Sequence, residues 1–293
     1  MSHFSESFFI LPITLAEGVS QSASSLFGKT SFLSFITNSF VLAGIVLLVI
    51  MWMARKATTN MQIIPHGWQN GFEGVVEFLY GKIEDITGPR VAKRAFPLLA
   101  SVFMFILVSN WFGLIPGVGT IGWGHGHGNL SLDAVTSPLL RPATADLNMT
   151  LGIALSFMIV WFIITIAEVG VIGFLKHMFA PKGKFSGIMM FLMAFIFAFV
   201  GIIEVVSIAF RPMSLSLRLF GNIFAGETLL HTMMSILHGA PPFIEFIGSI
   251  LIPLPFYFME LLVGLLQAVV FTLLCSVYLL LSTAHDEEHD EHH

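Results

Sequence analysis

An arginine, Arg218, lies in the middle of one of the most apolar segments of the chain, "SLSLRLFGNIFAGE" (214–227). Arginine keeps its proton in proteins, and its charge at the centre of a bilayer costs from about 3 to more than 10 kcal/mol. A charge this costly implies a use for a permanent cation, such as acting on a carboxylate or on a moving ion. Ion transport is therefore the first chemistry that the residue indicates.

Polar side chains recur along the same segment at helical spacing. With about 100° of rotation per residue, they fall within about 40° of the direction of Arg218. This polar line consists of Glu204, Ser207, Arg211, Ser214 and Asn222. Glu227 points to the opposite side of the helix, and His231 lies one turn further on that side. The helix is predicted to present one cationic face and one acidic face.

A second apolar segment carries further polar residues. Glu260 and Gln267 are seven residues apart, so they share a helix face, and Gly264 between them lets another helix approach closely. If Glu227 and Glu260 face each other, both cannot ionise easily at low dielectric, which suits a proton relay. The alternative is that Arg218 pairs with an acid and only joins helices. That alternative leaves the sorting of polar residues onto two faces unexplained.

The composition indicates the scaffold that positions these groups. Of 293 residues, 56% are hydrophobic and 11% are charged, which is about half the charged fraction of a soluble domain. Long segments with few or no charges recur, each able to span a bilayer. These features predict an all-α polytopic membrane protein. The net charge of −5 arises from an acidic C-terminal tail, so it does not indicate nucleic-acid binding.

We expect about five membrane-crossing helices and one amphipathic surface helix in a single membrane domain (36–283). An extramembrane arm (1–35) precedes the domain, and an acidic, histidine-rich solvated tail (284–293) follows it. The spans are predicted at about 36–54, 96–115, 148–174, 186–238 and 242–283, and the amphipathic helix begins after Gly67. The last two segments exceed one perpendicular crossing, so we expect strong tilt or a break in each.

Positive charges are concentrated in two loops, which the positive-inside rule assigns to the cytoplasm. Lys29 and Arg141 then lie on the outer side, the N-terminus is outside, and five crossings place the C-terminus in the cytoplasm. The two loops contain nine of the thirteen lysines and arginines: Arg55, Lys56, Lys82, Arg90, Lys93, Arg94, Lys176, Lys182 and Lys184.

Other polar residues give weaker signals. His125 and His127 in "GHGHG" and the histidines of the tail are better explained as solvated residues than as metal ligands. Asp146 is predicted to cap the third span or, alternatively, to contact an aqueous path for the ion on the outer side. The sequence contains no nucleotide-binding loop, catalytic triad or cysteine-based metal motif. We therefore expect no metal or cofactor.

"LSLRLFGNIFAGE" resembles the arginine-bearing motif of the a subunit of F-type ATP synthases. Four more stretches resemble the same family, most closely its bacterial and chloroplast members, so that the resemblance covers roughly residues 36–283. They are "IPHGWQNGFEGVVEF", "FILVSNWFGLIPG", "ATADLNMTLGIAL" and "LLQAVVFTLLCSVYLLLS".

The resemblance implies that the last two helices lie tilted against a rotating ring of c subunits, each with one mid-membrane carboxylate. Arg218 would face this ring, favour the ionised carboxylate and separate two aqueous half-channels, assisted by Asn222. The family's proton relay maps onto Glu227, Glu260 and Gln267, and the polar region near the cytoplasmic exit maps onto Glu204.

The resemblance also implies partners and a location. The chain would be a non-catalytic subunit of the enzyme complex, together with the c ring, the b subunits of the peripheral stalk, the F1 sector and membrane lipid. The bacterial inner membrane is the expected location, with a thylakoid or organelle inner membrane as the other choice.

The sequence departs from the family pattern at the relay. Family members often carry a histidine at one of the positions occupied here by Glu227 and Glu260, so His231 is a further candidate for the path. A stand-alone ion-coupled secondary transporter is the alternative function. It would favour an inverted internal repeat, and the sequence shows none. Both H⁺ and Na⁺ stay open as the transported ion at this point.

Overall fold

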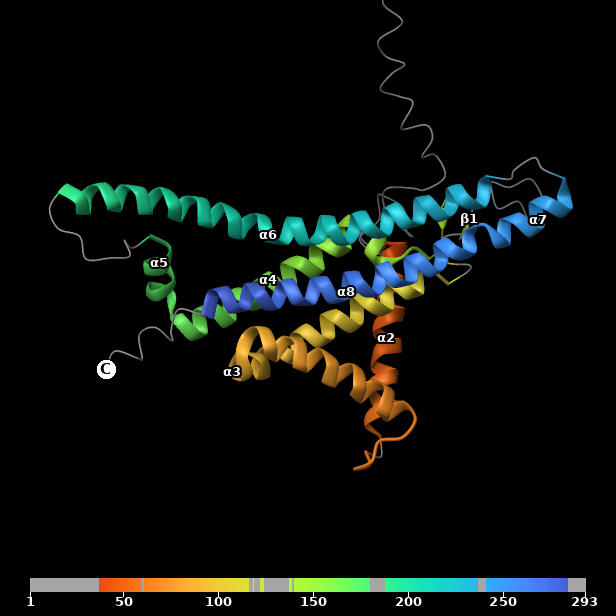
Figure 1. Ribbon diagram of the computed structural model, residues 1–293, viewed down its shortest axis with the longest axis horizontal. Helices are drawn as coiled ribbons and strands as arrows, with labels where there is room; N and C mark the ends of the chain where they lie inside the picture. Colours follow the sequence, from red (N-terminus) through yellow and green to blue (C-terminus); the bar gives the residue numbers. More distant parts are fainter. Residues whose placement is uncertain are drawn as a thin grey trace, which may run out of the picture. The chain divides into compact units, whose positions relative to one another are not determined.

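The computed structural model of the chain describes residues 37–59, 61–115, 118, 122–123, 137–138, 140–179, 188–236 and 241–283. The predicted arm, the His125–His127 loop, the basic residues Lys182 and Lys184, and the tail lie outside these ranges. The described part is almost entirely α-helical (Figure 1), so the predicted all-α class is confirmed. Two short strands in the described part, β1 (Gly122–Trp123) and β2 (Ser137–Pro138), pair in antiparallel orientation.

Helix α2 (Asn38–Thr58) corresponds to the first predicted span. The hydroxyl oxygen of Thr37 accepts a hydrogen bond from the backbone N–H of Phe40 and caps the N-terminus. Arg55 and Lys56 occupy the last turn, where positive charge interacts favourably with the helix dipole.

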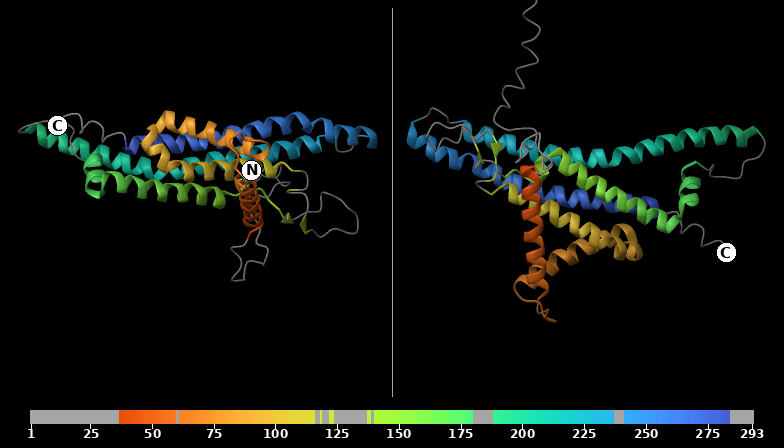
Figure 2. Two further views of the ribbon diagram at one scale, coloured as in Figure 1. Left: turned by 90° about the horizontal axis from the view of Figure 1, so that it is seen from below. Right: turned by 180° about the vertical axis from the view of Figure 1, so that it is seen from behind.

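Helix α3 (Trp68–Gly113) contains both the predicted amphipathic helix and the second span, and it reverses direction between them. Gly88 adopts φ 75°, a left-handed conformation that favours glycine, and Pro89 follows it. The rings of Tyr80 and Phe96, one from each half, meet edge to face at 5.2 Å. Figures 1 and 2 show the resulting hairpin within α3.

The third predicted span extends further towards the C-terminus than the helix does. Helix α4 (Leu147–Val169) ends before Gly170, whose φ of 75° stops the helix, and α5 (Val171–Phe179) then begins as a separate element. The expected end at about Phe174 is therefore wrong, because a glycine that can adopt positive φ lies inside an otherwise apolar run.

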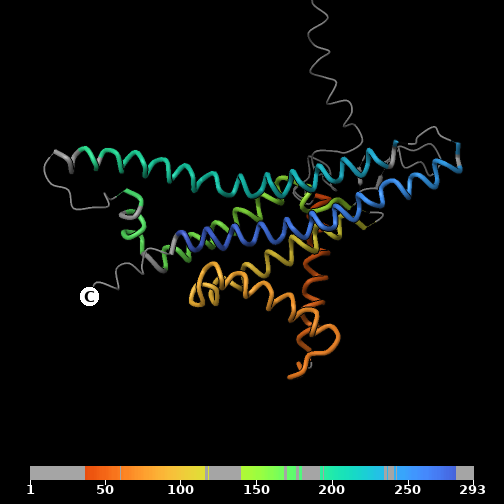
Figure 3. The backbone as a smooth tube through the Cα atoms, viewed as in Figure 1, coloured from red at the N-terminus to blue at the C-terminus, as the bar shows by residue number. Residues whose placement is uncertain are grey.

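Helix α6 (Ile188–Ser235) runs unbroken for 48 residues despite Pro212 inside it (Figure 3). At 1.5 Å per residue it is about 72 Å long, more than twice the roughly 30 Å of a bilayer core. Of the two expected possibilities, a break is therefore excluded for this segment.

The last predicted segment divides into α7 (Pro242–Leu251) and α8 (Pro253–Thr283). The one residue between them, Ile252, keeps right-handed helical dihedrals of φ −68° and ψ −45°. Since prolines cannot donate to the preceding turn, Pro253 accounts for the interruption.

Five helical segments in the described ranges are long and apolar enough to cross a membrane, as the sequence predicts. Their number and length are those of an integral, multi-pass membrane protein. The five segments are Asn38–Thr58, Trp68–Gly113, Leu147–Ala167, Phe195–Met233 and Phe243–Leu281.

The chain forms two compact units, each with its own apolar core. The first contains α2, residues 104–150 and residues 218–269, and it buries Leu42, Val46, Ile106, Leu219 and Ile223. The second contains the described parts of 61–103, 151–217 and 270–283, and it buries Leu79, Leu99, Phe157, Trp161 and Phe271. The single membrane domain over 36–283 stays a prediction.

Candidate functional site

The arginine at the centre of the apolar segment is exposed on the surface of α6. Its neighbours Leu215 and Leu219 are buried and fix α6 in the first turn on either side. Within the described ranges, Arg218 makes no hydrogen bond or ion pair. A membrane-embedded cation without a partner among the described residues needs a counter-charge from elsewhere.

The predicted polar line on α6 is largely an exposed face. Glu204, Ser207, Ser214 and Asn222 are all exposed, as Arg218 is. Their side chains are therefore available to a neighbouring molecule over about five turns of helix.

Arg211 is the exception on this line, because its side chain is only 13% exposed. In the second unit its guanidinium lies 4.8 Å from the ring centre of Tyr278 and 5.7 Å from that of Trp161. A carboxylate oxygen of Glu204 lies 3.4 Å away. These contacts hold Arg211 within the chain, so the two arginines of the line have different environments.

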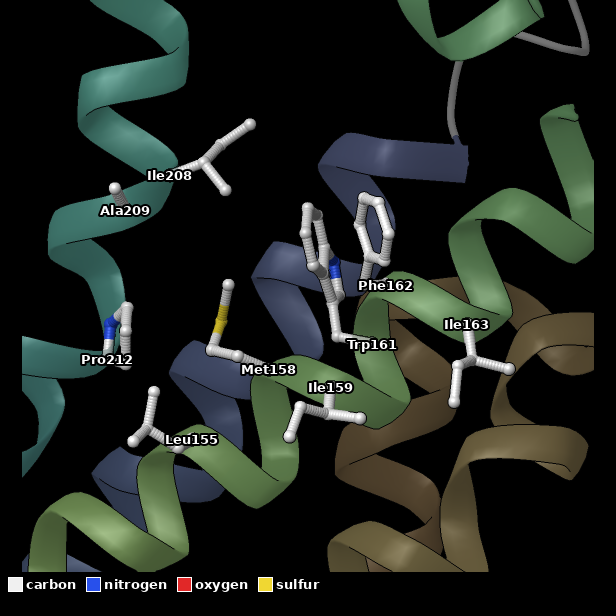
Figure 4. A pocket seen from close by; sticks show the side chains of 9 residues that line it. All are labelled: Leu155, Met158, Ile159, Trp161, Phe162, Ile163, Ile208, Ala209 and Pro212. Atoms are coloured by element: carbon white, nitrogen blue, oxygen red, sulfur yellow. The ribbon is translucent and has the colours of Figure 1, made fainter. Parts of the chain in front are cut away.

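Trp161 also borders an apolar groove of about 380 Å³ between α4 and α6 in the second unit (Figure 4). Its indole N–H donates to the carbonyl oxygen of Tyr278 at 3.0 Å, which satisfies the polar edge of the ring. The groove is apolar throughout and offers no group that could bind an ion. It is lined by Leu155, Met158, Ile159, Trp161, Phe162, Ile163, Ile208, Ala209 and Pro212.

In the first unit, Asn222 connects the exposed face of α6 to α8. Its side-chain amide donates to Oε1 of Gln267 at 2.7 Å. Gln267 is 4% exposed. One turn after Arg218, a polar contact therefore runs from the surface into the interior.

Glu260 lies against the backbone of α6 beside Glu227. A Cβ built on Gly226 would overlap the Glu260 carboxylate, so the absence of a side chain at that position makes room for the acid. Glu260 is 5% exposed, and both acids carry a buried carboxylate oxygen without a hydrogen-bond partner: Oε1 of Glu260 and Oε2 of Glu227.

His231 does not join this buried group. Its side chain is exposed, one turn beyond Glu227 on α6. The structure thus places Glu260 and Gln267 in the interior, with Glu227 half-buried and one of its oxygens buried. Asn222 lies at the edge of this group, and Arg218, Glu204 and His231 lie at the surface.

Two residues of α3 belong to the site although the sequence argument did not select them. The amide of Asn110 donates to the carbonyl oxygen of Gly264 at 3.1 Å, and the indole N–H of Trp111 donates to that of Leu261 at 3.2 Å. A Cβ on Gly264 would lie 3.1 Å from Asn110, so this glycine does allow a close helix approach, as predicted. An asparagine inside an apolar span is the signal that could have identified this contact.

Arg141, which the charge distribution assigns to the outer side of the membrane, is buried within the first unit and is 3% exposed. Its side of the membrane stays a prediction. Arg141 lies within electrostatic range of the Glu227 carboxylate.

Asp146 forms the predicted cap of α4. Its side-chain Oδ1 accepts a hydrogen bond from the backbone N–H of Asn148 at 3.1 Å, which confirms the prediction.

Several polar atoms of the first unit are buried and have no hydrogen-bond partner among the described residues, and four of these atoms belong to residues of the site. Buried polar groups in native proteins are normally satisfied, and bound water satisfies those that the protein does not. The arrangement is therefore suited to hold water and to exchange protons. The four atoms of the site are Oδ1 of Asn110, Oε2 of Glu227, Oε1 of Glu260 and Nε2 of Gln267.

The Gly226→Ala variant should displace the Glu260 carboxylate without changing any charge. The overlap involves the end of a side chain that can rotate, so α6 keeps its place and the acid moves. Because misplacing a reacting group by about 1 Å can cost as much as 100-fold in rate, we expect proton flux to fall by roughly tenfold with normal assembly. Gly44→Ala is the matched control, since its Cβ meets nothing within 4 Å. Equal flux in both variants would show that the position of Glu260 does not matter.

Comparison with known proteins connects this arrangement to one family. The family model described as ATP synthase A chain matches residues 36–280. The chain is 31% identical over 257 residues to ATP synthase subunit a of Mycobacterium ulcerans (strain Agy99), covering 88% of both chains. It is 32% identical over 244 residues to ATP synthase subunit a of Moorella thermoacetica, covering 83% of this chain and 89% of the relative. The chain belongs to the ATP synthase A chain family.

Proposed function

We propose that this chain is the stator a subunit of the membrane sector (Fo) of an F-type ATP synthase. In this role it provides the essential arginine and two aqueous half-channels for proton translocation coupled to rotation of a c-subunit ring. The observation that carries the proposal is Arg218, which is exposed on α6 and makes no hydrogen bond or ion pair within the described part of the chain. A carboxylate on a ring subunit would supply the negative charge that the exposed Arg218 guanidinium needs.

The permanent charge of Arg218 determines what it does to such a carboxylate. It favours the ionised form and therefore releases a proton from each ring carboxylate that arrives. A lysine could lose its own proton in an apolar site, whereas arginine does not. The driving force is about 2.3 kcal/mol per charge for each 100 mV of membrane potential.

The interior polar group of the first unit supplies one half-channel in this proposal. Protons pass between water and the ring through Glu227, Glu260 and Gln267, with Asn222 at the ring face. Glu204, exposed 14 residues before Arg218, belongs to the path on the cytoplasmic side. His231 lies at the surface, where it could only accept protons from outside water.

The complex needs further subunits. The c ring carries the moving carboxylates, the b subunits hold the stator, and the F1 sector performs the ATP chemistry, for which this chain has no motif. A stand-alone secondary transporter fits less well, because a transporter binds its ion among charges that face its own interior. Arg218 faces outward.

Cross-linking tests whether the face of Arg218 meets the ring. With Cys275 replaced by serine, a Ser214→Cys variant of the intact complex should form a disulfide or a short cross-link to the small ring subunits. Met213→Cys is the control, because Met213 is also exposed but points to the other side of α6. Equal cross-linking from both positions, or none from position 214, would contradict the proposal.

The orientation is part of the proposal: N-terminus outside, C-terminus in the cytoplasm of a bacterial cell, and the complex in the inner membrane. Lys93 is exposed in the hairpin of α3, within the predicted cytoplasmic loop. Lys93→Cys should react with an impermeant thiol reagent only from the cytoplasmic side, and His125→Cys only from the other. Labelling of both from one side would overturn the assignment.

A further inference from the structure

A short non-helical segment, residues 141–146, is buried inside the first unit. All six residues are buried, and the 3₁₀ turn η2 (Ala143–Ala145) packs against α2. Pro142 fits against Gly113, where an added Cβ would lie 2.9 Å from the proline ring. Irregular backbone is tolerated at membrane depth only where protein or water surrounds it. The segment is therefore part of the interior of this unit.

This segment carries a permanent positive charge into the interior. Arg141 is 3% exposed, and its Nη2 donates to the carbonyl oxygen of Ala145 at 3.0 Å. The nearby carboxylate on which its charge acts is that of Glu227 on α6. One oxygen of that carboxylate is buried without a hydrogen-bond partner among the described residues.

We propose that Arg141 is a positioning residue for proton transfer: a fixed counter-charge inside the first unit that keeps Glu227 able to release each proton it accepts. The inference rests on the proposed function, because it assigns a role within the same proton path. Arg141 keeps its own protons throughout. One proton arrives on a Glu227 oxygen from water and leaves from that carboxylate to the next acceptor.

Glu227 must both bind a proton and release it in each cycle, and the charges around it determine whether it can do both. A buried carboxylate without a counter-charge holds its proton, because burial disfavours the charged form. A fixed cation nearby favours the ionised form, so Glu227 is both emptied and refilled during each cycle. The other charged or titratable groups described on the elements of this unit include Asp146 on the buried segment, Glu260 on α8, Arg218 and His231 on α6, and Arg55 and Lys56 in the last turn of α2.

A purely structural role would rest on the hydrogen bond to Ala145 rather than on charge. Two substitutions separate these possibilities. Arg141→Gln removes the charge and keeps an amide donor. Arg141→Lys keeps a cation, because the carboxylates of Glu227 and Asp146 in the same unit favour the protonated ammonium, whereas the described residues supply no such counter-charge at position 218. If charge is what matters, the lysine variant should behave like the unmodified protein and the glutamine variant should not.

The test uses the intact ATP synthase reconstituted in vesicles, with ATP synthesis measured against the pH on the outer side at a fixed membrane potential. For Arg141→Gln we expect the midpoint of this pH dependence to move about one unit towards alkaline pH, as loss of a nearby opposite charge predicts. The maximal rate should fall about tenfold, since release of the proton is slowed by the same factor. Arg141→Lys should leave the midpoint in place.

A midpoint unchanged by Arg141→Gln would overturn the inference. If that variant fails to assemble, the yield of complex is compared with that of Arg141→Gln/Glu227→Gln. Recovery of assembly in the double variant supports charge compensation, and no recovery contradicts it. Arg218→Ala in the same vesicles distinguishes failure of this inference from failure of the proposed function. Normal ATP synthesis by Arg218→Ala refutes the proposed function. Loss of ATP synthesis in Arg218→Ala, together with an unchanged midpoint in Arg141→Gln, refutes only the role of Arg141.

Discussion

Replacement of Arg218 by alanine should abolish ATP-driven proton pumping while the ATP synthase complex stays assembled. The side chain is exposed and makes no hydrogen bond or ion pair within the described ranges, so its removal leaves no gap in the chain's own packing. Loss of an interaction of about 3 kcal/mol with a ring carboxylate would slow the transport step by more than about 100-fold. The measurement is quenching of a pH-sensitive dye on addition of ATP, normalised to the amount of assembled complex.

Two further variants sharpen this prediction. Arg218→Lys should be almost as inactive, because an ammonium is more strongly hydrated and can lose its proton in an apolar site. Leu217→Ala, one residue away and also exposed, should pump normally. Similar loss in the Leu217 and Arg218 variants would indicate damage to the surface of α6 rather than loss of a charge.

The second large effect should come from the two interior acids. Glu227→Gln and Glu260→Gln keep the size of each side chain, so the fit of Glu260 beside Gly226 is retained while an exchangeable charge is lost. Each single variant should reduce coupled proton flux by about 100-fold, the lower end of the range for a lost general acid–base step. The measurement is proton flux in reconstituted vesicles for both single variants and the double variant.

Coupling between the two acids is the distinctive part of this result. Because both would interrupt one path, the double variant should be little worse than the more severe single variant. Losses that add in log rate would instead mean that the acids have independent roles. Near-normal flux in both single variants would remove them from the path, and His231 would become the better candidate.

The number of membrane-crossing helices was predictable from the sequence, because the length of each apolar segment determines whether it can span a bilayer. Gly88 and Gly170 show the limit of that argument, since a sequence does not reveal which glycine adopts positive φ. These two glycines interrupt the helical path, whereas Gly221 and Gly226 lie within α6. Tertiary packing, which the local pattern does not contain, makes the difference.

The helix faces within α6 were predictable from its period, but the partners of its side chains were not. Asn222 and Gln267 are 45 residues apart, and only the packing of α6 on α8 brings them to 2.7 Å. Arg211 and Arg218 share a predicted line, yet aromatic rings from two other helices enclose only Arg211. Arg141 lies in a stretch rich in glycine, proline and serine, a composition typical of a surface loop. The burial of this segment depends on its packing against α2 and α3.

One experiment tests the central claim, that Arg218 couples proton movement to a partner ring and separates two half-channels. ATP-driven pumping and passive proton flow down an imposed gradient are measured in the same vesicles, for the unmodified complex and for Arg218→Ala. The account predicts that Arg218→Ala loses pumping completely but still conducts protons passively, because the half-channels remain and only the barrier between them is gone. Pumping at the unmodified rate by fully assembled Arg218→Ala complex would contradict it.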